Sequence, residues 1–170
     1  GSEMCIRDST WLTHGVFTVT LSAEDSEGNT HSIMVKVKID MRTVWSDTQT
    51  TSASMTFDAT PDCEDGDPLP DRITVSSTVT NPNGPGFFGG AAVDVTWSLK
   101  NPSEEEISSN TGTIADTGEE TWDYTTRDLV EGFWMLDVEV AENGDPVNVN
   151  NDVTIAYAEG AEDSTNPRPE

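Results

Sequence analysis

A period-of-two alternation of apolar and polar side chains constrains the fold of this chain more than any other feature. In the stretch FTVTLSA, Phe17, Val19 and Leu21 alternate with threonine and serine, and the stretch IMVKVKI over residues 33–39 repeats the pattern. Side chains two residues apart in a β-strand lie on the same face, so each stretch predicts a strand with one buried face. No stretch shows the i, i+3, i+4, i+7 spacing of an amphipathic helix. The sequence therefore predicts an all-β fold.

The first two predicted strands flank a polar stretch, residues 24–29, whose Gly28 and Asn29 adopt positive φ readily, so residues 15–39 predict a β-hairpin. Residues 41–51, MRTVWSDTQTT, indicate a linker into a second domain, and residues 101–118 indicate two short edge strands or irregular loops. Other alternating stretches place the following side chains inward: Ile73, Val75, Ser77, Val79, Val93, Val95, Trp97, Leu99, Trp134, Leu136, Val138, Val140, Val153, Ile155 and Tyr157. Short strands separated by turn signals predict an immunoglobulin-like β-sandwich over residues 42–158.

The chain is strongly acidic throughout its length. It contains 8 Lys and Arg residues against 32 Asp and Glu residues, which gives a formal net charge of −24. Such a surface repels phosphate backbones and anionic membranes, so we expect no nucleic-acid partner and no membrane insertion. Salt screens the self-repulsion of so many carboxylates, which favours salty surroundings. Residues 159–170, EGAEDSTNPRPE, lack apolar periodicity and are expected to form a flexible acidic tail.

The predicted hairpin resembles the last two strands of a PKD (polycystic kidney disease-type) domain. The residues that match this family's ending are Gly15, Phe17, Val19, Leu21, Asp25, Gly28 and Asn29. The resemblance implies that residues 10–41 are the C-terminal part of a PKD-like domain whose first half is missing. Isolated hairpins are marginally stable. We therefore expect this truncated hairpin either to lean on the second domain or to leave its apolar face uncovered.

The first nine residues, GSEMCIRDS, have a different character from the rest of the chain. Their back-translation resembles the transposase adaptor of short-read sequencing libraries. Residues 1–9 are therefore interpreted as translated adaptor sequence and not as part of the protein. On this interpretation Cys5 forms no disulfide with Cys63. Cys63 is then either a small packing residue or the partner of a cysteine in the missing part.

The stretch DLVEGFWMLDVEVAENGD, residues 128–145, is similar to a strand near the end of many bacterial and archaeal immunoglobulin-like domains. This resemblance implies a module of a secreted or cell-surface multidomain protein. An extracellular or cell-surface location is therefore expected, and the expected partners are neighbouring domains of the same parent chain, with surface proteins or polysaccharide as further candidates.

An acidic loop over residues 58–71 is the candidate metal site. Ca²⁺ takes six to eight oxygen ligands from flexible polar loops, and the candidate ligands are Asp62, Glu64, Asp65 and Asp67. The spacing differs from an EF-hand because no distal bidentate Glu follows. A solvated acidic loop without metal is the preferred interpretation, and calcium is the alternative. No other cofactor is expected.

Candidate catalytic motifs are weak. The stretch IADTG places Asp116 in an Asp-Thr-Gly sequence, but aspartic-protease chemistry needs two such carboxylates sharing a proton, and only one copy exists. A β-turn is the preferred interpretation. His14 and His31 have no zinc-ligand spacing, and no G-x-S-x-G motif occurs. The sequence therefore predicts a protein that is not an enzyme.

Five tryptophans raise the alternative of a sugar-stacking platform. Trp97 and Trp134 fall on inward faces and are predicted to lie in the core, whereas Trp122 fits either role. The remaining candidates are Trp11, Trp45 and the loop residues Phe87 and Phe88. The preferred function is a structural spacer or adhesion module, and the alternative is an accessory carbohydrate- or protein-binding module of a secreted hydrolase.

Overall fold

The computed structural model describes residues 13–62, 69–82, 90–142 and 144–158. The described residues form ten β-strands and no helix, so the predicted all-β class is confirmed. The strands are β1 (Gly15–Glu24), β2 (Thr30–Ile39), β3 (Met41–Thr50), β4 (Ser52–Asp58), β5 (Arg72–Thr80), β6 (Val93–Lys100), β7 (Glu106–Ile114), β8 (Glu119–Thr126), β9 (Phe133–Val140) and β10 (Val147–Ala156).

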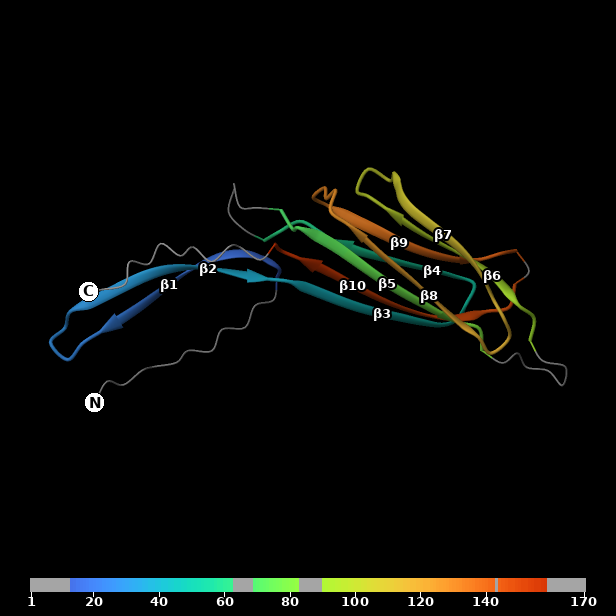
Figure 1. Cartoon of the computed structure of the whole chain (residues 1–170), viewed down its shortest axis with the longest axis horizontal. Coiled ribbons are helices and arrows are strands. Elements are labelled where there is room, and N and C mark those ends of the chain that lie inside the picture. Colours follow the sequence, from blue (N-terminus) through green and yellow to red (C-terminus); the bar gives the residue numbers. More distant parts are fainter. Residues whose placement is uncertain (1–12, 63–68, 83–89, 143, 159–170) are drawn as a thin grey trace.

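The first two strands form the predicted hairpin, which projects from one end of the remaining strands (Figure 1). The pairing is antiparallel and runs from Gly15 opposite Ile39 to Glu24 opposite Thr30. At its tip, the Asp25 carboxylate accepts the backbone N–H of Asn29 at 2.9 Å. Gly28 has a φ of 86°, a conformation that L-residues with side chains rarely adopt. We call this hairpin the arm.

The other eight strands form two four-stranded antiparallel sheets, with the orders β3-β10-β5-β8 and β4-β9-β6-β7. They pack face to face, which confirms the predicted immunoglobulin-like sandwich. Among these strands, β6 and β7 are the one consecutive pair within a single sheet, and every other connection crosses to the opposite sheet. The strand order itself is the double Greek-key order of jelly rolls, which shares the two-sheet architecture of the immunoglobulin sandwich and differs from it in connectivity.

The core lies between the two sheets and is built from the inward rows that the alternation predicted. Its largest fully buried side chains are Trp97, Trp134, Ile73, Leu99, Leu136 and Ile155. Strands β4, β5, β6, β9 and β10 bury about every second side chain, as in the alternating pattern of β5, from Ile73 to Val79. Burial of these apolar rows is the main force that holds the sheets together.

Two parts of the sequence form longer strands than predicted. Residues 41–50 are strand β3 rather than a linker, and Met41 and Trp45 pack against the core. The signal was weak because polar Thr43 and Asp47 share the inward face of this edge strand, which is only half-buried. Residues 106–114 form the single strand β7 rather than two short strands. β10 begins at Val147, before the predicted stretch from Val153.

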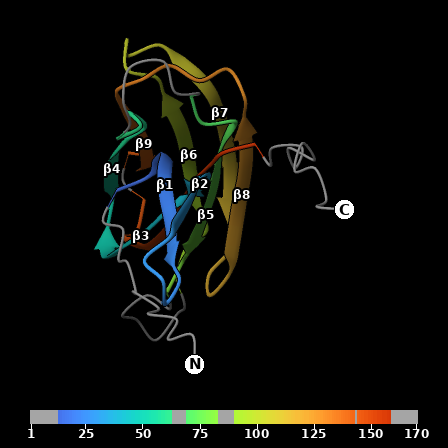
Figure 2. The ribbon, with the colours of Figure 1, turned by 90° about the vertical axis from the view of Figure 1, so that its left-hand side faces the viewer.

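The arm combines both alternatives that the sequence left open. Its base leans on the sandwich, where Val16 is 2% exposed. Its outer part leaves the apolar face uncovered, since Leu21 and Ile33 are 52% and 51% exposed. Figure 2 views the arm from its free end, in front of the end of the sandwich. The resemblance to a PKD-type domain stays a prediction.

Candidate functional site

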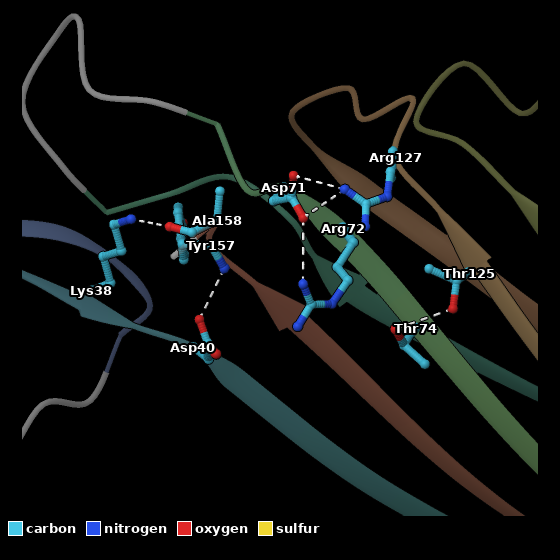
Figure 3. Close-up of polar contacts among 9 residues, drawn as sticks. All are labelled: Lys38, Asp40, Asp71, Arg72, Thr74, Thr125, Arg127, Tyr157 and Ala158. Atoms are coloured by element: carbon cyan, nitrogen blue, oxygen red, sulfur yellow. Dashed lines mark hydrogen bonds and ion pairs between the residues drawn. The ribbon is translucent and has the colours of Figure 1, made fainter. Parts of the chain in front are cut away.

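Polar groups that are far apart in the sequence meet at the junction between the arm and the sandwich (Figure 3). A single residue, Asp40, separates the end of β2 from the start of β3. Its Oδ1 accepts the backbone N–H of Tyr157 at 2.9 Å. Two residues earlier, Lys38 Nζ donates a hydrogen bond to the backbone oxygen of Ala158. The end of β2 is thereby tied to the chain that leaves β10.

The start of β1 is tied to the sandwich through His14, which is 6% exposed. Its Nε2 lies 3.2 Å from the backbone oxygen of Asp58. Because a carbonyl only accepts, Nε2 carries a proton, and in the neutral ring Nδ1 then accepts from the Tyr157 hydroxyl at 2.9 Å. The His14 backbone oxygen accepts the N–H of Asp62 at 3.0 Å. Both ring nitrogens therefore serve the junction rather than a metal or a substrate.

A second polar cluster ties neighbouring segments at the same end of the sandwich (Figure 3). Asp71 accepts hydrogen bonds from Arg127 at 3.2 Å and from Arg72 at 3.4 Å, and its backbone N–H donates to Ala156 O at 2.8 Å. Both arginines are substantially exposed, so each ion pair contributes little to stability. The cluster ties the start of β5 to the ends of β8 and β10, next to the junction. It offers no reactive group.

The Asp-Thr-Gly motif forms a turn between β7 and β8. The N–H of Gly118 donates to Ala115 O at 2.9 Å, which closes a β-turn, and Thr117 has a φ of 59°. The interpretation of this motif as a turn is confirmed. The motif lies on the tight connection that crosses from β7 to β8 in the opposite sheet, not in the paired cleft that aspartic-protease chemistry requires.

Of the candidate calcium ligands, Asp62 is exposed at the edge of the junction, and Glu64, Asp65 and Asp67 lie outside the described residues. Within the described ranges, no group of three or more His, Cys, Asp or Glu side chains could hold a metal ion. The calcium site stays a prediction. Cys5 and Cys63 also lie outside the described residues.

The four described tryptophans all point toward the core. Trp97 and Trp134 are 0% exposed, as predicted, and Trp45 packs against the same cluster. Trp122, whose role the sequence left open, is 8% exposed and stacks on Tyr124 with ring centroids 5.8 Å apart. Trp11, Phe87 and Phe88 lie outside the described residues. The tryptophans of the described strands therefore form a core rather than a solvent-facing platform.

Cross-strand polar pairs cover the outer faces of the sheets. Arg42 of β3 donates to both carboxylate oxygens of Asp152 on β10, and this hydrogen bond lowers the pKa of Asp152. On the other sheet, Lys100 donates to Asp137 at 2.8 Å, and this contact raises the pKa of Lys100. Both pairs are diagonal across their strands, since Arg42 lies opposite Thr154 and Lys100 lies opposite Met135. Among the described residues, no helix is long and apolar enough to cross a membrane.

No protein-family model matches the chain, and no curated protein matches it. Among solved structures, it is similar to dimeric latent PorU from Porphyromonas gingivalis, at 13% identity and a TM-score of 0.41, over 68% of this chain and 12% of that one. It is also similar to a structure of CBM51-2 in complex with GlcNAc and INT domains from Clostridium perfringens ZmpB, at 14% identity and a TM-score of 0.39, over 88% of this chain and 39% of that one.

A third similar structure is that of Bacillus endospore appendages, described as disulfide-linked pili, at 10% identity and a TM-score of 0.30, over 90% of this chain and all of that one. The chain spans 12% and 39% of the first two structures that it matches. At these identities and TM-scores the comparisons carry no statement about a family, a ligand or an activity of this chain.

Sequence reasoning missed the junction. His14 was considered only as a zinc ligand, and Tyr157 only as an inward-facing core residue. One local signal was present: Asp40 stands between two β-type stretches with no glycine or proline on either side. The absence of turn residues there indicates a strand that continues from the hairpin into the next domain.

Proposed function

We propose that this chain is a non-catalytic spacer segment of a secreted or cell-surface multidomain protein, in which the arm and the sandwich are held in a fixed orientation. Its partners in this proposal are neighbouring domains of the same parent chain. The dense acidic charge supports an extracellular setting, since a net charge of −24 keeps such a chain soluble where salt screens its self-repulsion.

The observation that carries the proposal is the passage from β2 to β3 through Asp40 alone. Flexible domain linkers are usually exposed segments across which few contacts run. Here the one intervening residue accepts a hydrogen bond from Tyr157, and His14 bonds to the Tyr157 hydroxyl from the other arm strand. Each arm strand is therefore fixed separately to the end of β10, which opposes bending in more than one direction.

The uncovered face of the arm supports a contact with another part of the parent chain. This face carries Phe17, Val19 and Leu21 from β1 and Ile33 and Val35 from β2. Val35 is paired with Val19, and Ile33 is paired with Leu21. Lys36 and Lys38 lie on the opposite face. Because an exposed apolar face without charged side chains marks a contact surface, a second β-sheet of the parent chain would cover this one.

The orientation is tested by measuring a distance along the molecule with two spin labels. Ser26→Cys at the arm tip and Thr48→Cys on β3 are both exposed sites, and Cys5→Ser and Cys63→Ser remove the two thiols already in the sequence. Eighteen residues of strand at about 3.3 Å each predict a separation of about 60 Å. A rigid junction gives one narrow distance distribution in double electron–electron resonance.

The matched control is the same labelled chain with a Gly-Ser-Gly-Ser insertion after Asp40, which frees the arm. The insertion should broaden the distribution severalfold. If the uninterrupted chain gives a distribution as broad as that of the insertion variant, the junction is a hinge and the spacer proposal fails.

A further inference from the structure

The core of the sandwich contains a polar cluster at its centre. Ser77 of β5 and Asn151 of β10 are each 0% exposed, and they stand directly opposite each other in the β5–β10 pair. From the facing sheet, Trp97 of β6 donates its indole N–H to Ser77 Oγ at 3.0 Å. Polar groups from both sheets therefore meet in the middle of the core, where the other inward side chains of β5 and β10 are valine and isoleucine.

The Asn151 amide makes no hydrogen bond within the described part of the chain. Both its Oδ1 and its Nδ2 are buried and without a partner. Since both atoms lack a partner, exchanging the oxygen and the nitrogen by rotating the amide leaves the result unchanged. Buried polar side chains are nearly always hydrogen-bonded, because an unsatisfied one retains its whole desolvation cost. This amide needs a partner that the described residues do not supply.

We propose that Asn151 and Ser77 bind a single buried water molecule between the sheets. The amide presents an acceptor oxygen and donor hydrogens side by side, so a cation would face the N–H groups and an anion would face the oxygen. A water molecule satisfies both, because it donates to Oδ1 and accepts from a neighbouring donor. Ser77 accepts from Trp97 and still has its own hydroxyl hydrogen to donate.

The placement of the two residues suits a bridging water. Directly opposed residues of antiparallel strands have Cβ atoms about 4.5–5.5 Å apart, a span that one water bridges between two short polar side chains. Buried waters usually make about three hydrogen bonds, which the two side chains can provide. The inward neighbours on the same strands are Val75, Val79, Val149 and Val153, which are at most 2% exposed. This apolar surround isolates the site, so the water should exchange slowly with solvent.

The test is a water–amide nuclear Overhauser measurement on the uniformly ¹⁵N-labelled full chain. Asn81 is a matched internal control, because it is 1% exposed and its Nδ2 donates to protein carbonyls, at 2.9 Å to Ala91 and at 3.2 Å to Ile114. We expect a cross-peak from water to the Asn151 side-chain amide hydrogens, with the sign of a long-lived bound water, and no such cross-peak at Asn81. Absence of the cross-peak at Asn151 overturns the site.

A crystal structure at high resolution provides the second readout. We expect an ordered oxygen within hydrogen-bond distance of Asn151 and of Ser77 Oγ. If the density shows instead a direct Asn151–Ser77 bond or an empty space, the site is overturned. In that case a cross-peak at Asn151 would reflect exchange relayed by the Ser77 hydroxyl, and it would not rescue the inference.

Discussion

The hydrogen bond between His14 and Tyr157 gives a direct test of how the arm is held. Tyr157→Phe removes one hydroxyl and leaves the aromatic ring, which is 5% exposed. The Nδ1 atom of the buried His14 ring then has no donor. Leaving a buried acceptor unsatisfied costs about 1–3 kcal/mol, so we expect the variant to lose about 1–2 kcal/mol of unfolding free energy.

Urea unfolding followed by tryptophan fluorescence measures this loss, because the described tryptophans lie in the sandwich. For a sandwich of this size, 1–2 kcal/mol corresponds to a fall in melting temperature of about 4–8 °C. Tyr124→Phe is the matched control on β8, where the ring stacks on Trp122. We expect the control to change the unfolding free energy by less than about 0.5 kcal/mol.

A double-mutant cycle assigns the loss to the pair. His14→Ala alone also removes the contact with Asp58, so it should cost more than Tyr157→Phe. The double variant should cost less than the sum of the two by about 1 kcal/mol, since the shared hydrogen bond can be lost only once. If Tyr157→Phe costs no more than Tyr124→Phe, or if the two changes add fully, this contact does not fix the arm and the reasoning is refuted.

Three further predictions concern the surface, the arm and the acidic loop. Because its hydrogen bond with Arg42 lowers the pKa of Asp152, the wild type should be more stable than Asp152→Asn above pH 3.8, and urea midpoints should converge as the pH falls through the lowered pKa; a constant difference contradicts this. Leu21→Ser should reduce binding of the dye ANS at the uncovered arm face, whereas Thr20→Ser on the opposite face should not; equal binding by both contradicts it. If Ca²⁺ binds the acidic loop, millimolar Ca²⁺ should raise the melting temperature of the wild type and not that of an Asp62→Asn, Asp65→Asn variant, and an unmoved wild type ends the calcium hypothesis.

Local patterns were sufficient to assign the faces of most strands. The inward rows of β5, β6 and β9 follow from alternation alone, because the side-chain period of a strand is set by its own backbone. Trp97 and Trp134 were placed in the core on this basis, and both are fully buried. The weak patterns failed where an edge strand buries little, as in β3, or where asparagines interrupt the pattern, as in the first half of β10.

The all-β class, the hairpin and most core side chains could be predicted from the sequence, since each depends on residues that are close neighbours along the chain. Which strands pair, and therefore where the junction and the Asn151 site lie, emerged only from the folded structure. His14 meets Tyr157 across 143 residues, and Asn151 meets Ser77 because β10 inserts between β3 and β5. Strand order depends on the packing of two whole sheets at once, so no single stretch of sequence encodes these meetings.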